Sequence, residues 1–116
     1  MDQIIDSLST ELRRGNLTLA VLSQLRTPQY GYSLVQLLAE LGVEIEQSTL
    51  YPLLRRLEKQ ELVVSFWDTS GARPRKYYEL SQEGEIVFQQ IKEEWIKNTK
   101  KLYEVLKEED DADGFN

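Results

Sequence analysis

A basic amphipathic helix followed at once by a β-hairpin is the feature that most limits how this chain can fold. Residues 48–60 carry leucines three and four positions apart, which predicts a helix with one apolar face. Residues 62–67 and 75–80 are rich in β-branched and aromatic side chains, and the segment 68–74 between them has the Gly, Pro, Asp and Ser of a turn. The order predicts a helix that leads directly into a hairpin, or wing.

Helical periodicity also precedes this unit. Residues 3–14 and 17–25 predict two helices, with Gly15-Asn16 ending the first and starting the second. Residues 33–41 predict a third helix, which Gly42 is expected to stop in the left-handed conformation. The third helix and the basic helix then form a helix-turn-helix pair, whose second helix enters the major groove of DNA.

Two local features add detail before and within the basic helix. Residues 43–45 alternate between apolar and polar side chains, which predicts a minor strand. Pro52 is expected in the first helical turn, with Ser48 or Thr49 as the cap, because an interior proline costs about 3 kcal/mol.

The C-terminal third predicts one long helix. Ser81 can cap this helix, which is expected to run to about Lys107, and the acid-rich residues 108–116 predict a disordered tail. The fold class is thus mainly α with a small β-hairpin wing. The expected divisions are a winged helix-turn-helix DNA-binding domain over 1–80, a C-terminal dimerisation helix over 81–107, and the tail.

Composition excludes several classes of function. The 116 residues include no cysteine and no histidine, which removes Cys/His nucleophiles, the usual zinc ligands and the commonest general base. We therefore expect neither an enzyme nor a cofactor or metal site. No apolar run approaches the roughly 20 residues needed to cross a bilayer, and the first residues do not form a signal peptide, so a cytoplasmic protein is expected.

The distribution of charge favours nucleic acid in spite of the net charge of −6, because affinity for phosphate depends on local charge. Between Ser48 and Tyr77, six basic residues stand against three acidic ones. Arg73 and Lys76 of the hairpin are expected to contact phosphates. When its leucines point inward, the basic helix is expected to present these residues to DNA: Ser48, Thr49, Tyr51, Arg55, Arg56 and Lys59.

Four ordered blocks of the sequence resemble the PadR family of winged-helix regulators, over about residues 12–106. They are residues 48–58 with Leu62-Val63, Arg14-Gly15 with Leu17 and Leu19, Tyr30-Gly31-Tyr32, and residues 75–81 with Gly84. One position departs from the pattern, since sequences of this family commonly have glycine where this chain has Glu61. A glutamate in a left-handed helix cap is expected to be strained.

The resemblance implies a repressor-like homodimer whose C-terminal helix forms the dimer interface. That helix has more apolar surface than a small domain can cover, which supports the same interpretation. The resemblance further implies a small aromatic effector, for which Trp95 is the candidate stacking residue. Trp95 could equally anchor the core or the interface. The expected interface residues are Phe88, Ile91, Trp95, Leu102 and Leu106.

A second function from another class remains open. The winged helix could serve as a protein-interaction module that binds no DNA, and the isoelectric point near 4.7 is the best support for this alternative. DNA binding that does not change with salt, or no binding, would favour it.

Overall fold

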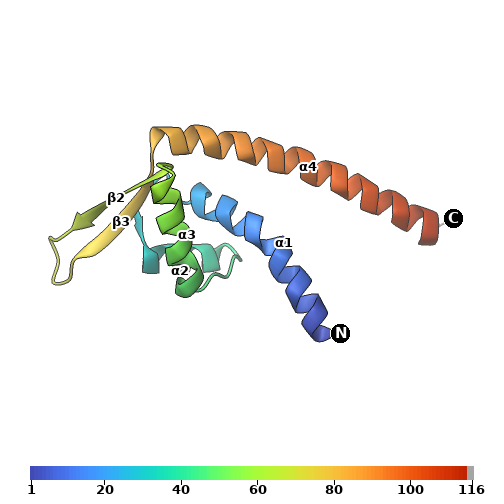
Figure 1. Cartoon of the computed structure of the whole chain (residues 1–116), viewed down its shortest axis with the longest axis horizontal. Coiled ribbons are helices and arrows are strands. Elements are labelled where there is room, and N and C mark those ends of the chain that lie inside the picture. Colours follow the sequence, from blue (N-terminus) through green and yellow to red (C-terminus); the bar gives the residue numbers. More distant parts are fainter. Residues whose placement is uncertain (115–116) are drawn as a thin grey trace.

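The computed structural model describes the backbone of residues 1–114 and the side-chain surroundings of residues 1–107. Helices and a small antiparallel sheet alternate along this part of the chain (Figure 1). The elements are α1 (Asp2–Ser23), β1 (Gln29–Tyr30), α2 (Gly31–Glu40), α3 (Gln47–Lys59), β2 (Val63–Asp68), β3 (Arg75–Leu80) and α4 (Gln82–Gly114). The order confirms the predicted winged helix-turn-helix with a long C-terminal helix.

The core forms where the leucine faces of three helices meet. Burying each of these side chains stabilises the fold by roughly 1.5–3 kcal/mol. Tyr78 of β3 and Phe88 of α4 close the core from the sheet and from the last helix. The fully buried side chains are Val21, Leu22, Leu25, Leu34, Leu38, Leu50, Leu54, Leu57 and Val63.

The sheet has the order β1-β3-β2, so β3 is its central strand. Directly paired residues share a face, and β2 pairs Trp67 with Lys76 and Phe66 with Tyr77. Lys76 lies two residues from the buried Tyr78, on the side that meets α3. We call the side with Trp67, Lys76 and Tyr78 the inner face of the wing, and the side with Phe66 and Tyr77 its outer face.

The expected break between two N-terminal helices is wrong. α1 is continuous from Asp2 to Ser23, and Met1 rather than Asp2 is its N-cap. Gly15 lies inside the helix, where a glycine costs only about 1 kcal/mol relative to alanine. The helical hydrogen bonds and the burial of the C-terminal half of α1 outweigh that preference.

The expected strand at residues 43–45 is also wrong, because this segment has no regular structure. The third strand is instead the two-residue β1, in which Gln29 and Tyr30 pair with Tyr78 and Tyr77. Tyr30 is the N-cap of α2, and its backbone N–H donates to the Ser33 hydroxyl at 3.0 Å. Ser33 is therefore the third residue of α2, whereas the sequence predicted a helix over residues 33–41. As predicted, Gly42 has a positive φ of 87° just after α2.

The start of α3 differs from the expected cap. Its N-cap is Glu46, with no side-chain hydrogen bond, so neither Ser48 nor Thr49 caps the helix. Pro52 consequently lies in the second turn, where it cannot donate to the carbonyl of Ser48. Ser48 is exposed, so water can satisfy that carbonyl.

The junction between α3, β2 and α4 depends on Glu61 and Ser81. Glu61 has a φ of 64°, so this residue takes the left-handed conformation in which a glutamate is expected to be strained. The Ser81 hydroxyl donates to the Glu61 carbonyl at 2.7 Å and accepts from the Gly84 N–H at 2.9 Å, which confirms Ser81 as the cap of α4. A methyl group at Gly84 would overlap the Leu62 carbonyl, so α4 begins directly against the chain that enters β2.

Glu61→Gly is expected to raise the free energy of unfolding by about 1 kcal/mol, because the left-handed conformation costs a residue with a side chain about 1–2 kcal/mol and glycine almost nothing. Thermal unfolding followed by circular dichroism measures the change. Gln60→Gly is the matched control, since Gln60 has a φ of −79° and glycine there should only destabilise. Equal effects of the two variants would show that Glu61 is not strained.

α4 extends beyond the end expected at Lys107, because its backbone stays helical to Gly114. The predicted tail of residues 108–116 lies outside the residues whose side chains are described, and residues 115–116 lie outside the described backbone. The α4 helix projects far from the core, as does the N-terminal half of α1 (Figure 1). The radius of gyration is 17.7 Å, whereas a compact chain of this length has about 13 Å.

Candidate nucleic-acid interface

The exposed face of α3 is centred on residues spaced three and four positions apart, opposite its buried leucines. Arg55 and Lys59 lie here together with Ser48 and Pro52, and all four are exposed. The structure thus brings two of the predicted basic residues into one row. Ser48 lies at the start of the row, where a DNA base edge or phosphate could approach the helix N-terminus.

One flank of α3 faces α1. Thr49 and Arg56 line a hollow of about 570 Å³ together with Arg14 and Thr18 of α1. Neither Arg14 nor Arg56 has a carboxylate within 4.0 Å among the described side chains. Arg14 therefore extends the basic surface of α3, and sequence reasoning assigned no role to this residue because its distance from α3 along the chain hides the contact.

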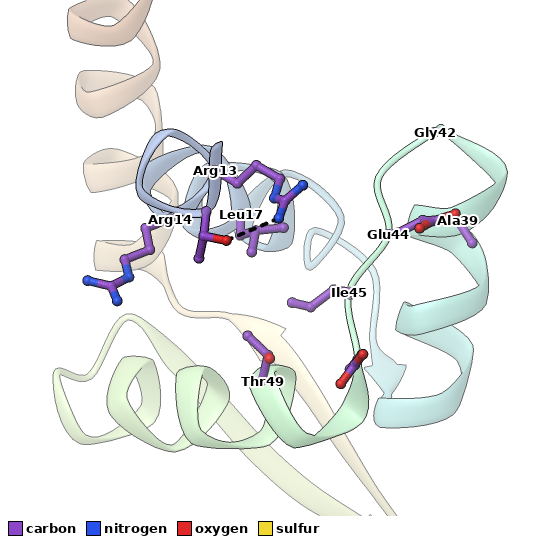
Figure 2. A pocket seen from close by; sticks show the side chains of 10 residues that line it. Arg13, Arg14, Leu17, Ala39, Gly42, Glu44, Ile45 and Thr49 are labelled. Carbon is purple, nitrogen blue, oxygen red and sulfur yellow. Dashed lines mark hydrogen bonds between the residues drawn. The ribbon is translucent and has the colours of Figure 1, made fainter. Parts of the chain in front are cut away.

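An adjoining hollow of about 820 Å³ does not continue this basic surface (Figure 2). Its walls include Arg13 and Arg14, but also Glu44 and Glu46 from the segment between α2 and α3. Arg13 donates to the Thr10 hydroxyl at 3.4 Å, and in Figure 2 Arg13 and Arg14 point away from each other. The mixed charge makes this hollow a poor site for a phosphate backbone.

The other flank of α3 contacts the inner face of the wing. Glu58 accepts a hydrogen bond from Ser65 of β2, and the Lys76 Nζ lies 3.7 Å from a Glu58 oxygen. Lys76 is thus half-buried and already paired, unlike the free phosphate contact expected from the sequence. Tyr51 is half-buried as well, and its ring lies so close to Gly31 that no Cβ would fit there.

Tyr78 lies at this contact and stays neutral at physiological pH. Burial and then the Glu58 carboxylate raise the pKa of the Tyr78 phenol above its ordinary value of 10.0, against a smaller opposite effect of Arg55. The contacts of Glu58 with Ser65 and Lys76 place the exposed row of α3 next to the wing.

Among the side chains that the structure describes, Arg73 is the cation of the wing tip that is available to a ligand. Arg73 is exposed, and no ion pair holds it among the described residues. Arg75 instead lies over the Tyr30 ring at 4.6 Å. Asp68 is turned toward Ser70, whose hydroxyl donates at 2.6 Å and whose N–H donates at 2.9 Å, and these bonds lower the pKa of Asp68. The acid at the tip is therefore held by the turn and leaves Arg73 free.

Comparison with known proteins assigns the family. Residues 18–90, more than half of the chain, match the model of the transcriptional regulator PadR-like family. The chain belongs to this family. Members of the PadR-like family are transcriptional regulators that bind DNA, and they are not enzymes.

Solved PadR-like structures share the fold. A PadR family transcriptional regulator from Eggerthella lenta DSM 2243 is 48% identical, with a TM-score of 0.84, and the match covers 90% of this chain and 94% of that one. A Streptococcus transcriptional regulator is 33% identical, with a TM-score of 0.72 and coverage of 81% and 95%. An uncharacterized protein of Lysinibacillus sphaericus is 29% identical over 93 residues, which span 76% of this chain and 85% of that protein.

The PadR-like chain exposes most of the apolar residues expected at a dimer interface. Trp95 is 45% exposed, Leu102 55% and Leu106 52%, while Ile91 is at 37%. Phe88 differs, because it is buried in the core of its own chain. The predicted set therefore reduces to four residues that are free to meet a partner.

Trp95 lies above a hollow of about 410 Å³ between α1 and α4 of this PadR-like chain. Its indole N–H donates to the Asn16 side-chain oxygen at 2.9 Å, which fixes the ring. Arg26 and Lys92 also line the hollow, and their charges lie 5.0 and 6.0 Å from the centre of the Phe88 ring.

Among the described residues, no helix combines the length and apolar character that a membrane span needs.

Proposed function

We propose that the chain is a homodimeric repressor that binds duplex DNA sequence-specifically through α3 and the wing. The observation that carries the proposal is the exposed row of Arg55 and Lys59 on α3, flanked by Arg56 and followed by Arg73 at the wing tip. The major groove admits an α-helix, and cations on both sides of it can reach phosphates. Ser48 and Thr49 stand where the helix would enter the groove, whereas Tyr51 and Lys76 support the contact between helix and wing.

Exposed apolar side chains form one stripe along α1 and another along α4, and these two stripes support the homodimer. Exposed large apolar side chains of this number are unusual in a monomer. The chain also extends well beyond a compact shape, since α4 and the start of α1 leave the core. A second copy that packed on both stripes would cover Ile4, Ile5, Leu8 and Leu12 of α1 and Trp95, Leu102, Val105 and Leu106 of α4.

A two-fold dimer would present two α3 helices to one face of DNA. Half-sites are then expected about one helical turn, roughly 34 Å, apart. Such an arrangement blocks a promoter by occupying it, which is the simplest mode of repression.

Footprinting tests the proposal on the DNA upstream of the gene that encodes this chain. The expected result is a protected region with two half-sites, together with lower transcription from that promoter in a reconstituted assay. Protection of DNA without half-sites, or no protection at protein concentrations well above the micromolar range, would contradict sequence-specific binding. The protein-interaction module would then be the better explanation.

The hollow at Trp95 is proposed as the site of a small aromatic effector. Its fixed indole and Phe88 suit a flat ring, and Lys92 suits a carboxylate or phenolate on that ring, whereas Arg26 is held by the Glu85 carboxylate at 2.8 Å. In a Trp67→Phe variant, the fluorescence of Trp95 alone is expected to change on titration with benzoate or hydroxycinnamate. The same compound should release the footprint. An unchanged spectrum at millimolar compound would remove the effector from the proposal without affecting DNA binding.

A further inference from the structure

Trp67 is a large apolar side chain that is not part of the buried core. It lies on the inner face of the wing, opposite Lys76, yet it is 63% exposed. Among the described residues it has no ring partner of the kind that holds the other wing aromatics. An exposed tryptophan beside a cationic loop is more often part of a contact surface than of a core.

The outer face of the wing behaves differently. There Phe66 stacks on Tyr77 with ring centres 5.7 Å apart, and Tyr77 meets Tyr30 edge to face at 5.4 Å. These three rings contact one another, and Phe66 is still 44% exposed. Phe66 is therefore a natural control for Trp67, because it lies next to it in the same strand but points to the other side.

A hollow of about 340 Å³ opens beneath Trp67, between the wing and the helices. Tyr51 of α3 and Pro74 of the wing loop form apolar parts of its wall, and the half-buried Lys76 lines it from the same face as Trp67. Of the nearby acids, Glu58 is paired with Lys76 and Asp68 is bonded to Ser70. The hollow thus combines flat apolar walls with one lysine, whose distance to the Glu58 carboxylate is 3.7 Å, and these surroundings suit a sugar next to a phosphate.

The position of the hollow indicates which part of a DNA duplex would enter it. It lies between α3 and the wing, next to the exposed row with Arg55. If α3 occupies the major groove and the wing tip reaches an adjacent groove, the backbone that separates the two grooves must pass between them.

We propose that this hollow receives the sugar-phosphate backbone of one DNA strand and that Trp67 packs on a deoxyribose there. The inference rests on the proposed DNA-binding function and adds a contact to it. Trp67 thereby contributes affinity through an apolar contact, in contrast to the charged contacts of α3.

Trp67→Ala is expected to weaken binding to the footprinted duplex at least about thirtyfold, because a dimer loses two aromatic contacts of about 1–3 kcal/mol each. The dependence of affinity on salt should stay unchanged, because no charge is removed. Trp67→Phe should recover part of the loss. Phe66→Ala should bind DNA as the wild type does.

Fluorescence provides a second measurement that does not depend on affinity. In a Trp95→Phe variant, Trp67 is the single tryptophan. Addition of the duplex is expected to change its emission and to protect it from quenching by acrylamide, a neutral quencher that DNA does not repel.

The outcomes separate the inference from the function on which it rests. If the wild type binds the duplex but Trp67 stays equally accessible to acrylamide and Trp67→Ala binds normally, the inference is wrong and the DNA-binding proposal stands. A larger loss for Phe66→Ala than for Trp67→Ala would place the outer face on DNA and would also overturn it. If the wild type protects no DNA, the proposed function itself fails.

Discussion

Replacing Arg55 and Arg73 together by alanine is expected to weaken DNA binding about a thousandfold while the chain stays folded and dimeric. Both side chains are exposed and unpaired among the described residues, so their loss removes contacts to DNA and none that hold the fold. Each charge occurs twice in a dimer, and each contact to a base or phosphate contributes about 1–3 kcal/mol. Titration of the footprinted duplex with each variant measures the effect.

The matched control removes two charges that lie outside the proposed interface. Lys97 and Lys100 are exposed on α4, so Lys97→Ala with Lys100→Ala changes the net charge of the chain equally. This control should bind DNA within about threefold of the wild type, since distant exposed charges are largely screened. If both double variants lose affinity equally, binding depends on overall charge and the assigned surface is wrong.

Leu102→Glu is expected to weaken dimerisation at least a hundredfold, because it places a charge where the proposed interface buries a leucine. The side chain is 55% exposed in the single chain, so the variant monomer should still fold. Each copy loses roughly 1.5–3 kcal/mol of apolar burial, and two copies meet at the interface. Sedimentation analysis over a range of concentrations measures the dissociation constant.

Gln90→Glu adds the same charge to α4 without entering the proposed interface. Gln90 is exposed two positions from the buried Phe88, and therefore on the side of α4 that faces away from the core. This variant should remain dimeric and bind DNA. A wild-type chain that sediments as a monomer at high micromolar concentration would contradict the dimer outright.

Periodicity predicted the elements that are amphipathic on their own. Helix α3 and strand β3 follow from local patterns, and β3 occupies the expected residues 75–80. The errors arise where tertiary structure overrides a local preference. Gly15 stays helical within α1, and Tyr30 becomes a strand residue because Tyr77 offers it a partner. The sequence around Tyr30 does not show that Tyr77 will lie beside it.

For the candidate site too, local patterns predicted the residues on one helix face, whereas contacts between elements were not predicted. The spacing of Arg55 and Lys59 on α3 was sufficient to place both on the exposed side. The pairing of Lys76 with Glu58 joins two elements, and the nearness of Arg14 to Arg56 joins the first helix to the third. Contacts of this kind depend on how elements pack, so a single sequence read in order could not supply them.

The salt dependence of binding to the footprinted duplex tests most directly whether a cationic surface on an acidic chain meets DNA. With about three phosphate contacts for each protomer, the logarithm of the association constant should fall with the logarithm of salt concentration at a slope of about −5. A slope near zero between about 50 and 200 mM salt, or no binding at the lowest salt, would show that α3 and the wing do not bind the DNA backbone.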